Sequence, residues 1–128
     1  MFSEIKTDND IKYFLDKTNM LHDGYIIDIQ YKHNGIKRME DGLYFCPDQT
    51  KLTLQILVTS NFDTVVEIEF ENVLEWQIKD AASYVFATYV YFSDEDSIVW
   101  SSEFCQNPDD LKKYSYVIAK SMKWRIVE

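Results

Sequence analysis

Apolar residues near the start of the chain recur with the period of a helix. Thr7 and Asp10 have the spacing of a capping box, in which each side chain bonds the backbone N–H of the other residue. Three apolar residues then follow at intervals of three and four, namely Ile11, Phe14 and Leu15. This pattern predicts an amphipathic helix over about residues 8–18. Because a helix of this length is unstable alone, we expect its apolar stripe to pack on a sheet.

From Gly24 onward the period changes to two, which predicts β-strands. The first strand ends near residues 34–35 and alternates Ile27, Ile29 and Tyr31 with Asp28 and Gln30, so we expect it to be half-buried on its apolar side. Further strands are predicted over residues 52–59, 66–71, 74–78, 98–104 and 116–126, with a weaker one over 39–45 that contains a turn at 40–42. Tight connections are expected at residues 60–63 and 93–96. Residues 84–92 are apolar on both faces, which predicts the middle of the sheet.

The remaining signal is a short helix start near the end of the chain. Asn107, Pro108, Asp109 and Asp110 supply a cap, a first-turn proline and acids, so they predict one or two helical turns. The chain lacks the alternating helices that parallel strands require. The sequence therefore predicts a single α+β domain over residues 1–128. We expect a largely antiparallel sheet of six to eight strands, curled or sandwich-like, with the short N-terminal helix packed on it.

Composition places this domain in a reducing compartment. No apolar run reaches the length of a membrane span, and the start MFSEIKTDND lacks the basic and apolar regions of a secretory signal. Cys46 and Cys105 belong to no C-x-x-C pair, and two thiols do not make a disulfide framework. We therefore expect a cytoplasmic protein with two reduced thiols and no membrane contact.

The net charge of −9 is distributed unevenly. Residues 41–110 carry fourteen acids and two bases, whereas residues 111–128 carry one acid and five bases. A surface dominated by the acidic segment repels phosphate backbones, so we expect no nucleic-acid binding and favour a basic protein partner. The simpler alternative is that the acids keep the protein soluble.

Few residues have the types and spacing that catalysis requires. His22 and Asp23 are adjacent, but neighbours on an extended chain point to opposite faces, so we expect a turn or core-capping role and no catalytic dyad. Two lone histidines and two distant cysteines give no zinc spacing, and the acids at 94–96 lack the glycine and distal glutamate of a calcium loop. With three glycines in the chain, nucleotide-binding loops are excluded. We predict no catalytic residues, no metal and no cofactor.

The most unusual local feature is an acidic stripe, defined as Glu67, Glu69 and Glu71 on one strand face and extended by Glu75. Like charges two residues apart on a strand lie roughly 7 Å apart and repel, so something must offset the cost. Water and salt can do so, and Lys123 and Arg125 share one parity of the last strand and can pair with the stripe across the sheet. The remaining interpretation is that these four acids bind a basic partner. The three tryptophans share parity with apolar neighbours, which predicts core positions.

Three stretches, LHDGYIIDIQY, LTLQILV and FENVLEWQI, carry a resemblance to small uncharacterised bacterial proteins, some of them assigned as immunity proteins of polymorphic toxin systems. The resemblance lies in a His-Asp pair before the first strand, here His22 and Asp23, and in a Phe-x-x-Val junction, here Phe70 and Val73. It covers about half of the chain and implies no catalytic residues.

These observations lead to a functional expectation with two alternatives. We expect a non-enzymatic, acidic protein-binding domain, which the resemblance suggests neutralises a basic toxin. The first alternative is a small-ligand or enzymatic pocket in which His22 or an acid supplies the chemistry, and an interior cavity would distinguish it. The second is a structural subunit that dimerises through an aromatic sheet face. Monomer and homodimer therefore both stay open.

Overall fold

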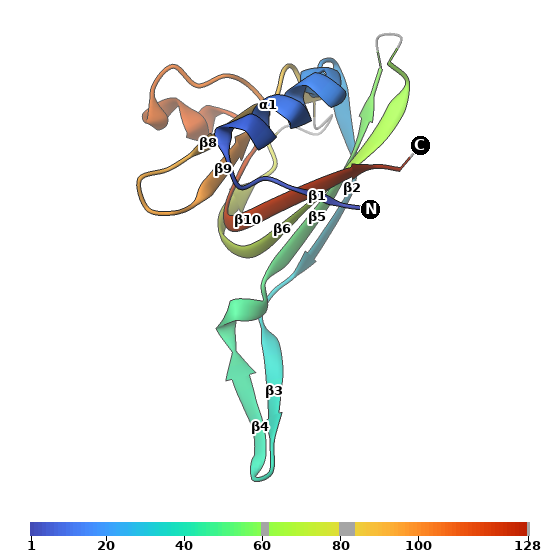
Figure 1. Ribbon diagram of the computed structural model, residues 1–128. Coiled ribbons are helices and arrows are strands. Elements are labelled where there is room, and N and C mark those ends of the chain that lie inside the picture. Colours follow the sequence, from blue (N-terminus) through green and yellow to red (C-terminus); the bar gives the residue numbers. More distant parts are fainter. Residues whose placement is uncertain (60–61, 80–83, 128) are drawn as a thin grey trace.

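The computed structural model describes residues 1–59, 62–79 and 84–127 and is built mainly of antiparallel strands (Figure 1). The elements in chain order are β1 (Ser3–Glu4), α1 (Asp8–Lys17), η1 (Asn19–Leu21), β2 (Gly24–Lys32), β3 (Gly35–Met39), β4 (Gly42–Cys46), η2 (Pro47–Gln49), β5 (Lys51–Val58), β6 (Thr64–Gln77), β7 (Tyr84–Val85), β8 (Tyr89–Phe92), β9 (Ile98–Ser101), η3 (Pro108–Lys113) and β10 (Tyr116–Ile126). The main sheet has the order β7-β2-β5-β6-β10-β9-β8, with β1 added to β10, and β3 and β4 form a separate two-stranded sheet. A largely antiparallel, curled sheet with one short helix is thus confirmed, and the helical content is small.

Helix α1 begins where the sequence predicts, at a capping box. The backbone N–H of Asp10 donates to the Thr7 hydroxyl over 3.2 Å, and the backbone N–H of Thr7 donates to the Asp10 carboxylate over 3.0 Å. Ile11 and Phe14 on its apolar stripe are buried in the main core. Figure 1 shows the helix lying across one face of the curled sheet. The sheet therefore supplies the packing that a ten-residue helix needs.

The two faces of the sheet carry different clusters. The main core, on the side of α1, takes alternate residues from the central strands and includes Leu54, Ile68 and Trp100. A smaller cluster on the opposite face consists of buried Val99, Cys105, Leu111 and Tyr116, with partly buried neighbours that include Ile118. Leu111 belongs to η3, so η3 covers the β9–β10 end of the sheet on the side away from α1. Trp100 and Trp124 are buried and Trp76 packs at the edge of the main core, which confirms their predicted positions.

The prediction for residues 84–92 was wrong. These residues do not form the middle of the sheet. Tyr84–Val85 form β7 at one edge and Tyr89–Phe92 form β8 at the other. The chain bends between them, and Val85 and Val90 are both buried although each lies in an edge strand. The apolar pattern therefore comes from two edge strands that bury one valine each in the main core, while Phe86 and Phe92 are exposed. Strand β9 also ends at Ser101, earlier than predicted.

Residues 64–77 form one long strand, where two were predicted. Asn72 adopts a positive φ of 52°, and the register to β10 shifts between Ile118 and Ala119. The register shift leaves Leu74 as the extra residue of a β-bulge, and together with the positive φ of Asn72 it changes the side on which the following residues lie. As a result Val73 is buried, whereas Leu74, predicted to face inward with Trp76, is 57% exposed. The predicted connection at 60–63 lies partly outside the described residues.

A bulge also changes the prediction for β2. Ile26 lies opposite Ile56 and Asp28 lies opposite Gln55, so Ile27 is the extra residue and is exposed. Ile29 and Tyr31 keep the core-side parity, since they lie opposite buried Leu54 and Leu52. They are nevertheless about 40% exposed, and among the described residues β7 pairs with the first two residues of β2. The apolar side of this strand is therefore only partly covered.

The hairpin of β3 and β4, hereafter the arm, projects from the main sheet (Figure 1). It confirms the weaker strand with a turn that was predicted over residues 39–45. The hairpin is longer than predicted and covers residues 35–46. Cys46 at its end and buried Cys105 are both free thiols, as expected. Within the described residues, no helix has the length and apolar character to cross a membrane.

Candidate functional site

The acidic stripe lies on the face opposite α1 and is matched by bases from neighbouring strands. Arg125 approaches the Glu67 carboxylate with its Nη2 at 2.7 Å and its Nε at 2.7 Å from the same oxygen, Oε2. Lys51 lies 2.6 Å from the Glu69 carboxylate. Lys123 lies 3.4 Å from Glu71 and 3.8 Å from Glu69. Strand register causes this, because Glu67, Glu69 and Glu71 lie opposite Arg125, Lys123 and Ser121 of β10.

These ion pairs are partly shielded from water. Glu67 and Glu69 are only 9% and 6% exposed, and the hydrogen bond to Glu69 holds the pKa of Lys51 above its ordinary value. The ring of Phe2 covers the bases, with the Arg125 guanidinium carbon 4.5 Å and the Lys123 ammonium 5.0 Å from its centroid. The internal partners that the sequence allowed are therefore present. A role of the stripe in binding a partner stays a prediction.

Glu75, the fourth acid, occupies a different environment because it follows Asn72 and the bulge at Leu74. Its carboxylate accepts a hydrogen bond from the hydroxyl of Tyr116. Burial, followed by this bond, raises the pKa of Tyr116 to about 12. Glu75 also lies opposite Ile118 in the β6–β10 ladder. It therefore borders the second cluster and not the stripe.

Beside Glu75 the surface contains a groove of about 570 Å³, which we call the acid-rimmed groove. Its floor includes Val99, Leu111 and Ile118 of the second cluster. Two large exposed side chains line it, Leu74 at 57% and Phe92 at 39%. The groove exists because Leu74 is the extra residue of a β-bulge and points outward, and because η3 docks on the sheet.

Two acids from the β8–β9 turn, Asp94 and Glu95, complete the lining. Both are exposed, and across the part of the chain that the structure describes neither carboxylate lies within ion-pair distance of a base. Lys120 donates to the backbone carbonyl of Glu95 over 3.4 Å and not to its carboxylate. The groove thus combines an apolar floor with uncompensated negative charge. The sequence predicted this acidic turn as a hairpin tip in solvent. No sequence pattern predicted the groove beside it.

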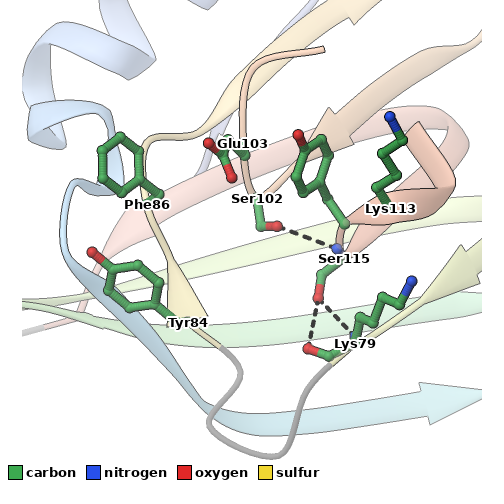
Figure 2. A pocket seen from close by; sticks show the side chains of 8 residues that line it. Lys79, Tyr84, Phe86, Ser102, Glu103, Lys113 and Ser115 are labelled. Atoms are coloured by element: carbon green, nitrogen blue, oxygen red, sulfur yellow. Dashed lines mark hydrogen bonds between the residues drawn. The ribbon is translucent and has the colours of Figure 1, made fainter. Parts of the chain in front are cut away.

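A second hollow, of about 320 Å³, lies near the opposite edge of the sheet (Figure 2). Figure 2 shows the ammonium groups of Lys79 and Lys113 on one side and the rings of Tyr84 and Phe86 on the other. Its two serines hold the backbone: Ser102 Oγ accepts from the Ser115 N–H over 3.2 Å, and Ser115 Oγ accepts from the Lys79 N–H over 2.8 Å. Because these hydroxyls join loops and neither bonds a histidine in the described structure, they lack the base that activates a nucleophile.

His22 and Asp23 do approach each other, contrary to the expectation from an extended chain. Asp23 has a positive φ of 56°, which brings its Oδ2 to 3.2 Å from His22 Nδ1. The other carboxylate oxygen accepts a 2.6 Å hydrogen bond from the hydroxyl of Tyr84, which raises the pKa of Tyr84 to about 12. The Thr59 hydroxyl donates to the backbone carbonyl of Asp23. These contacts tie the start of β2 to β7 and to the end of β5, as a turn residue does.

No group of three or more metal-ligating side chains occurs within residues 1–59, 62–79 and 84–127. Comparison of the chain with protein-family models, with curated proteins and with solved structures gives no match. The fold and the site define a curled antiparallel sheet with an acid-rimmed groove on its outer face. Any functional conclusion therefore rests on the geometry of this chain.

Proposed function

We propose that the chain is a non-enzymatic protein-binding domain that takes a basic, partly apolar segment of a partner protein in the acid-rimmed groove. The observation that carries this proposal is the pairing of exposed Leu74 and Phe92 with the uncompensated Asp94 and Glu95. Apolar side chains of a partner would be desolvated on the floor, while its lysines or arginines meet the acids at the rim. In the cytoplasm such a domain would serve as an immunity protein that neutralises a basic toxin.

The internal pairing of the stripe supports the choice of the groove. Glu67 and Glu69 would have to lose their ion pairs with Arg125 and Lys51 before they could bind another base. The free energy lost with these pairs would offset the free energy gained from the new contact. Asp94 and Glu95 have no such ion pair in the described structure, so they can bind a base of the partner without losing an internal contact. None of the four acids first proposed for partner binding is among the residues that line the groove. Glu75 follows Leu74 and lies opposite Ile118, and both of these neighbours line it.

The test uses a synthetic peptide of alternating lysine and leucine as probe, with a glutamate-leucine peptide as its control. Asp94→Asn combined with Glu95→Gln should weaken binding of the lysine peptide by about five- to thirtyfold, and added salt should weaken it in the wild type. Leu74→Ser should weaken binding while leaving the dependence on salt unchanged.

The matched control removes two exposed acids elsewhere, Glu4→Gln with Asp16→Asn. It should leave affinity nearly unchanged. Equal losses in the control and in the groove variant would show that the peptide senses only overall charge, and the proposal would fail. A toxin gene beside the gene for this chain would further support the immunity role.

A further inference from the structure

The arm exposes more apolar surface than a two-stranded sheet can keep in water unaided. Five large side chains are at least 46% exposed: Ile36, Met39, Leu43, Tyr44 and Phe45. An isolated hairpin is at best marginally stable, and each of its strands keeps one row of unpaired backbone groups. Within the part of the chain that the structure describes, β3 and β4 form a sheet of their own, and the arm pairs only with itself. A second surface that removes these apolar side chains from water would therefore stabilise the arm.

The register of the arm divides its side chains between two faces. Ile36 lies opposite Phe45, and Arg38 lies opposite Leu43, so these four share one face. Lys37 and Tyr44 share the other. One face is therefore mainly apolar, and the charged residues of the hairpin strands, Lys37 and Arg38, both belong to β3.

The edge of β4 contains no charged residue, in contrast to that of β3. Natural sheets protect exposed edges with charges, and the sequence of β4, GLYFC, has none. If two copies of β4 pair antiparallel about Tyr44, Leu43 of each copy lies opposite Phe45 of the other, on the same face as Ile36. This register joins the two apolar faces into one and creates no contact between like charges.

The charge distribution also favours a second copy at this place. Lys37 and Arg38 balance Glu40 and Asp41, so the net charge of −9 falls on the rest of the chain. Because the arm projects from the main sheet, two arms can meet while their acidic bodies stay apart (Figure 1). Body-to-body repulsion then acts over a distance that salt screens. We infer that β4 is a self-pairing edge that joins two copies of this chain through their arms.

Sedimentation equilibrium from about 1 µM to about 1 mM protein tests this inference. We expect a mass that rises from 15.2 kDa toward twice that value, and a dimer that added salt strengthens because it screens the acidic bodies. Binding at the acid-rimmed groove should instead weaken with salt, so the two proposals can fail separately. A monomer throughout this range, or a dimer that salt dissociates, would overturn the inference.

The variant Phe45→Lys places a charge on the apolar face beside the edge and should abolish the doubled mass. Ile27→Lys is the matched control, since Ile27 is also an exposed apolar strand residue and lies outside the arm, and it should dimerise as the wild type does. Circular dichroism of both variants checks that they fold. In a Cys46→Ser background, Tyr44→Cys should form an intermolecular disulfide, because the register places this residue opposite its own copy. A dimer that survives Phe45→Lys would show that another surface is used.

Discussion

Arg125 directs two nitrogens, Nε and Nη2, at the same carboxylate oxygen of Glu67, each at 2.7 Å. This pair lies on the face of the sheet opposite α1, where the Glu67 side chain is only 12% exposed. A charge-assisted contact with two donors in a shielded place is stronger than an ordinary surface ion pair. The acidic stripe thus contributes to the cohesion of β6 and β10.

The first prediction follows from this pair. Glu67→Gln should lower the free energy of unfolding by about 1–3 kcal/mol, because it leaves a partly buried guanidinium without its counter-charge. Glu71→Gln is the control on the same strand face, since the Glu71 side chain is 49% exposed and should cost less than about 1 kcal/mol. Urea denaturation measures both variants. Similar losses in the two would show that the Arg125 contact adds little.

Tyr84 gives a prediction for alkaline pH. Its bond to Asp23 raises its pKa from 10.0 to about 12, so the folded state holds this proton more tightly than the unfolded state does. The contribution to stability is therefore complete below pH 10 and is lost as the pH rises toward 12. Ultraviolet titration of the nine tyrosines should show two late steps near pH 12, from Tyr84 and Tyr116, while Tyr44 and Tyr91 also have pKa values raised by an Asp41 hydrogen bond and by burial, respectively.

The variant Tyr84→Phe should remove one of these two steps and reduce the loss of stability between pH 10 and pH 12. Tyr13→Phe, at an exposed tyrosine of α1, should leave both late steps in place. If Tyr84→Phe also leaves both steps, the late titration belongs to other residues and the Asp23 bond does not persist in solution.

The bulge in β6 leads to a third prediction. Asn72 holds a φ of 52°, a conformation that glycine adopts freely and β-branched residues adopt at a cost. Asn72→Val should therefore destabilise the fold by about 1–2 kcal/mol, while Asn72→Gly should change it little. Thermal denaturation compares the two. Because Asn72 lies two residues before the bulge that turns Leu74 outward, Asn72→Val should also weaken peptide binding in the groove. Equal stability of both variants would contradict the strained backbone.

A fourth prediction concerns the packing of α1 on the sheet. Phe14 is fully buried, with its ring centroid 5.3 Å from that of Trp124. Phe14→Ala should cost about 3–5 kcal/mol, because it removes apolar contacts and leaves a cavity. Tyr13→Ala, one residue earlier on the exposed side, should cost much less. The unfolding midpoint in urea distinguishes them, and a small effect of Phe14→Ala would mean that α1 packs loosely.

The sequence predicted structure wherever the alternation was unbroken. The capping box located α1, and the clean alternation over residues 52–58 located β5. It failed where one extra residue changes the parity, at Ile27 and at Leu74, because a bulge has no reliable residue signature. It also failed at residues 84–92, since two edge strands that carry exposed aromatic residues beside buried valines have the same apolar pattern as a central strand.

The candidate site was predictable to a lesser degree. Parity alone brought Lys123 and Arg125 within reach of the acidic stripe, since paired strands bring matching faces together. The groove was not predictable, because it depends on η3 docking against residues that lie far away in the sequence. Asp94 and Glu95 were seen as a turn, and only the fold places Leu74 and Phe92 beside them.

The bend between β7 and β8 has a consequence for the whole sheet. Only three residues, 86–88, separate two strands that lie at opposite edges, and this segment bonds to both sides. Asp23 N–H donates to the carbonyl of Phe86, whose own N–H donates to the carbonyl of Ser102, and Thr88 N–H donates to the carbonyl of Met20. The hydrogen bonds of this segment therefore join the two edges of the curled sheet. Because isolated amides hold this segment, its amide hydrogens should exchange earlier than those of the paired strands β5, β6 and β10. The two edges of the sheet can then separate while the central strands stay paired.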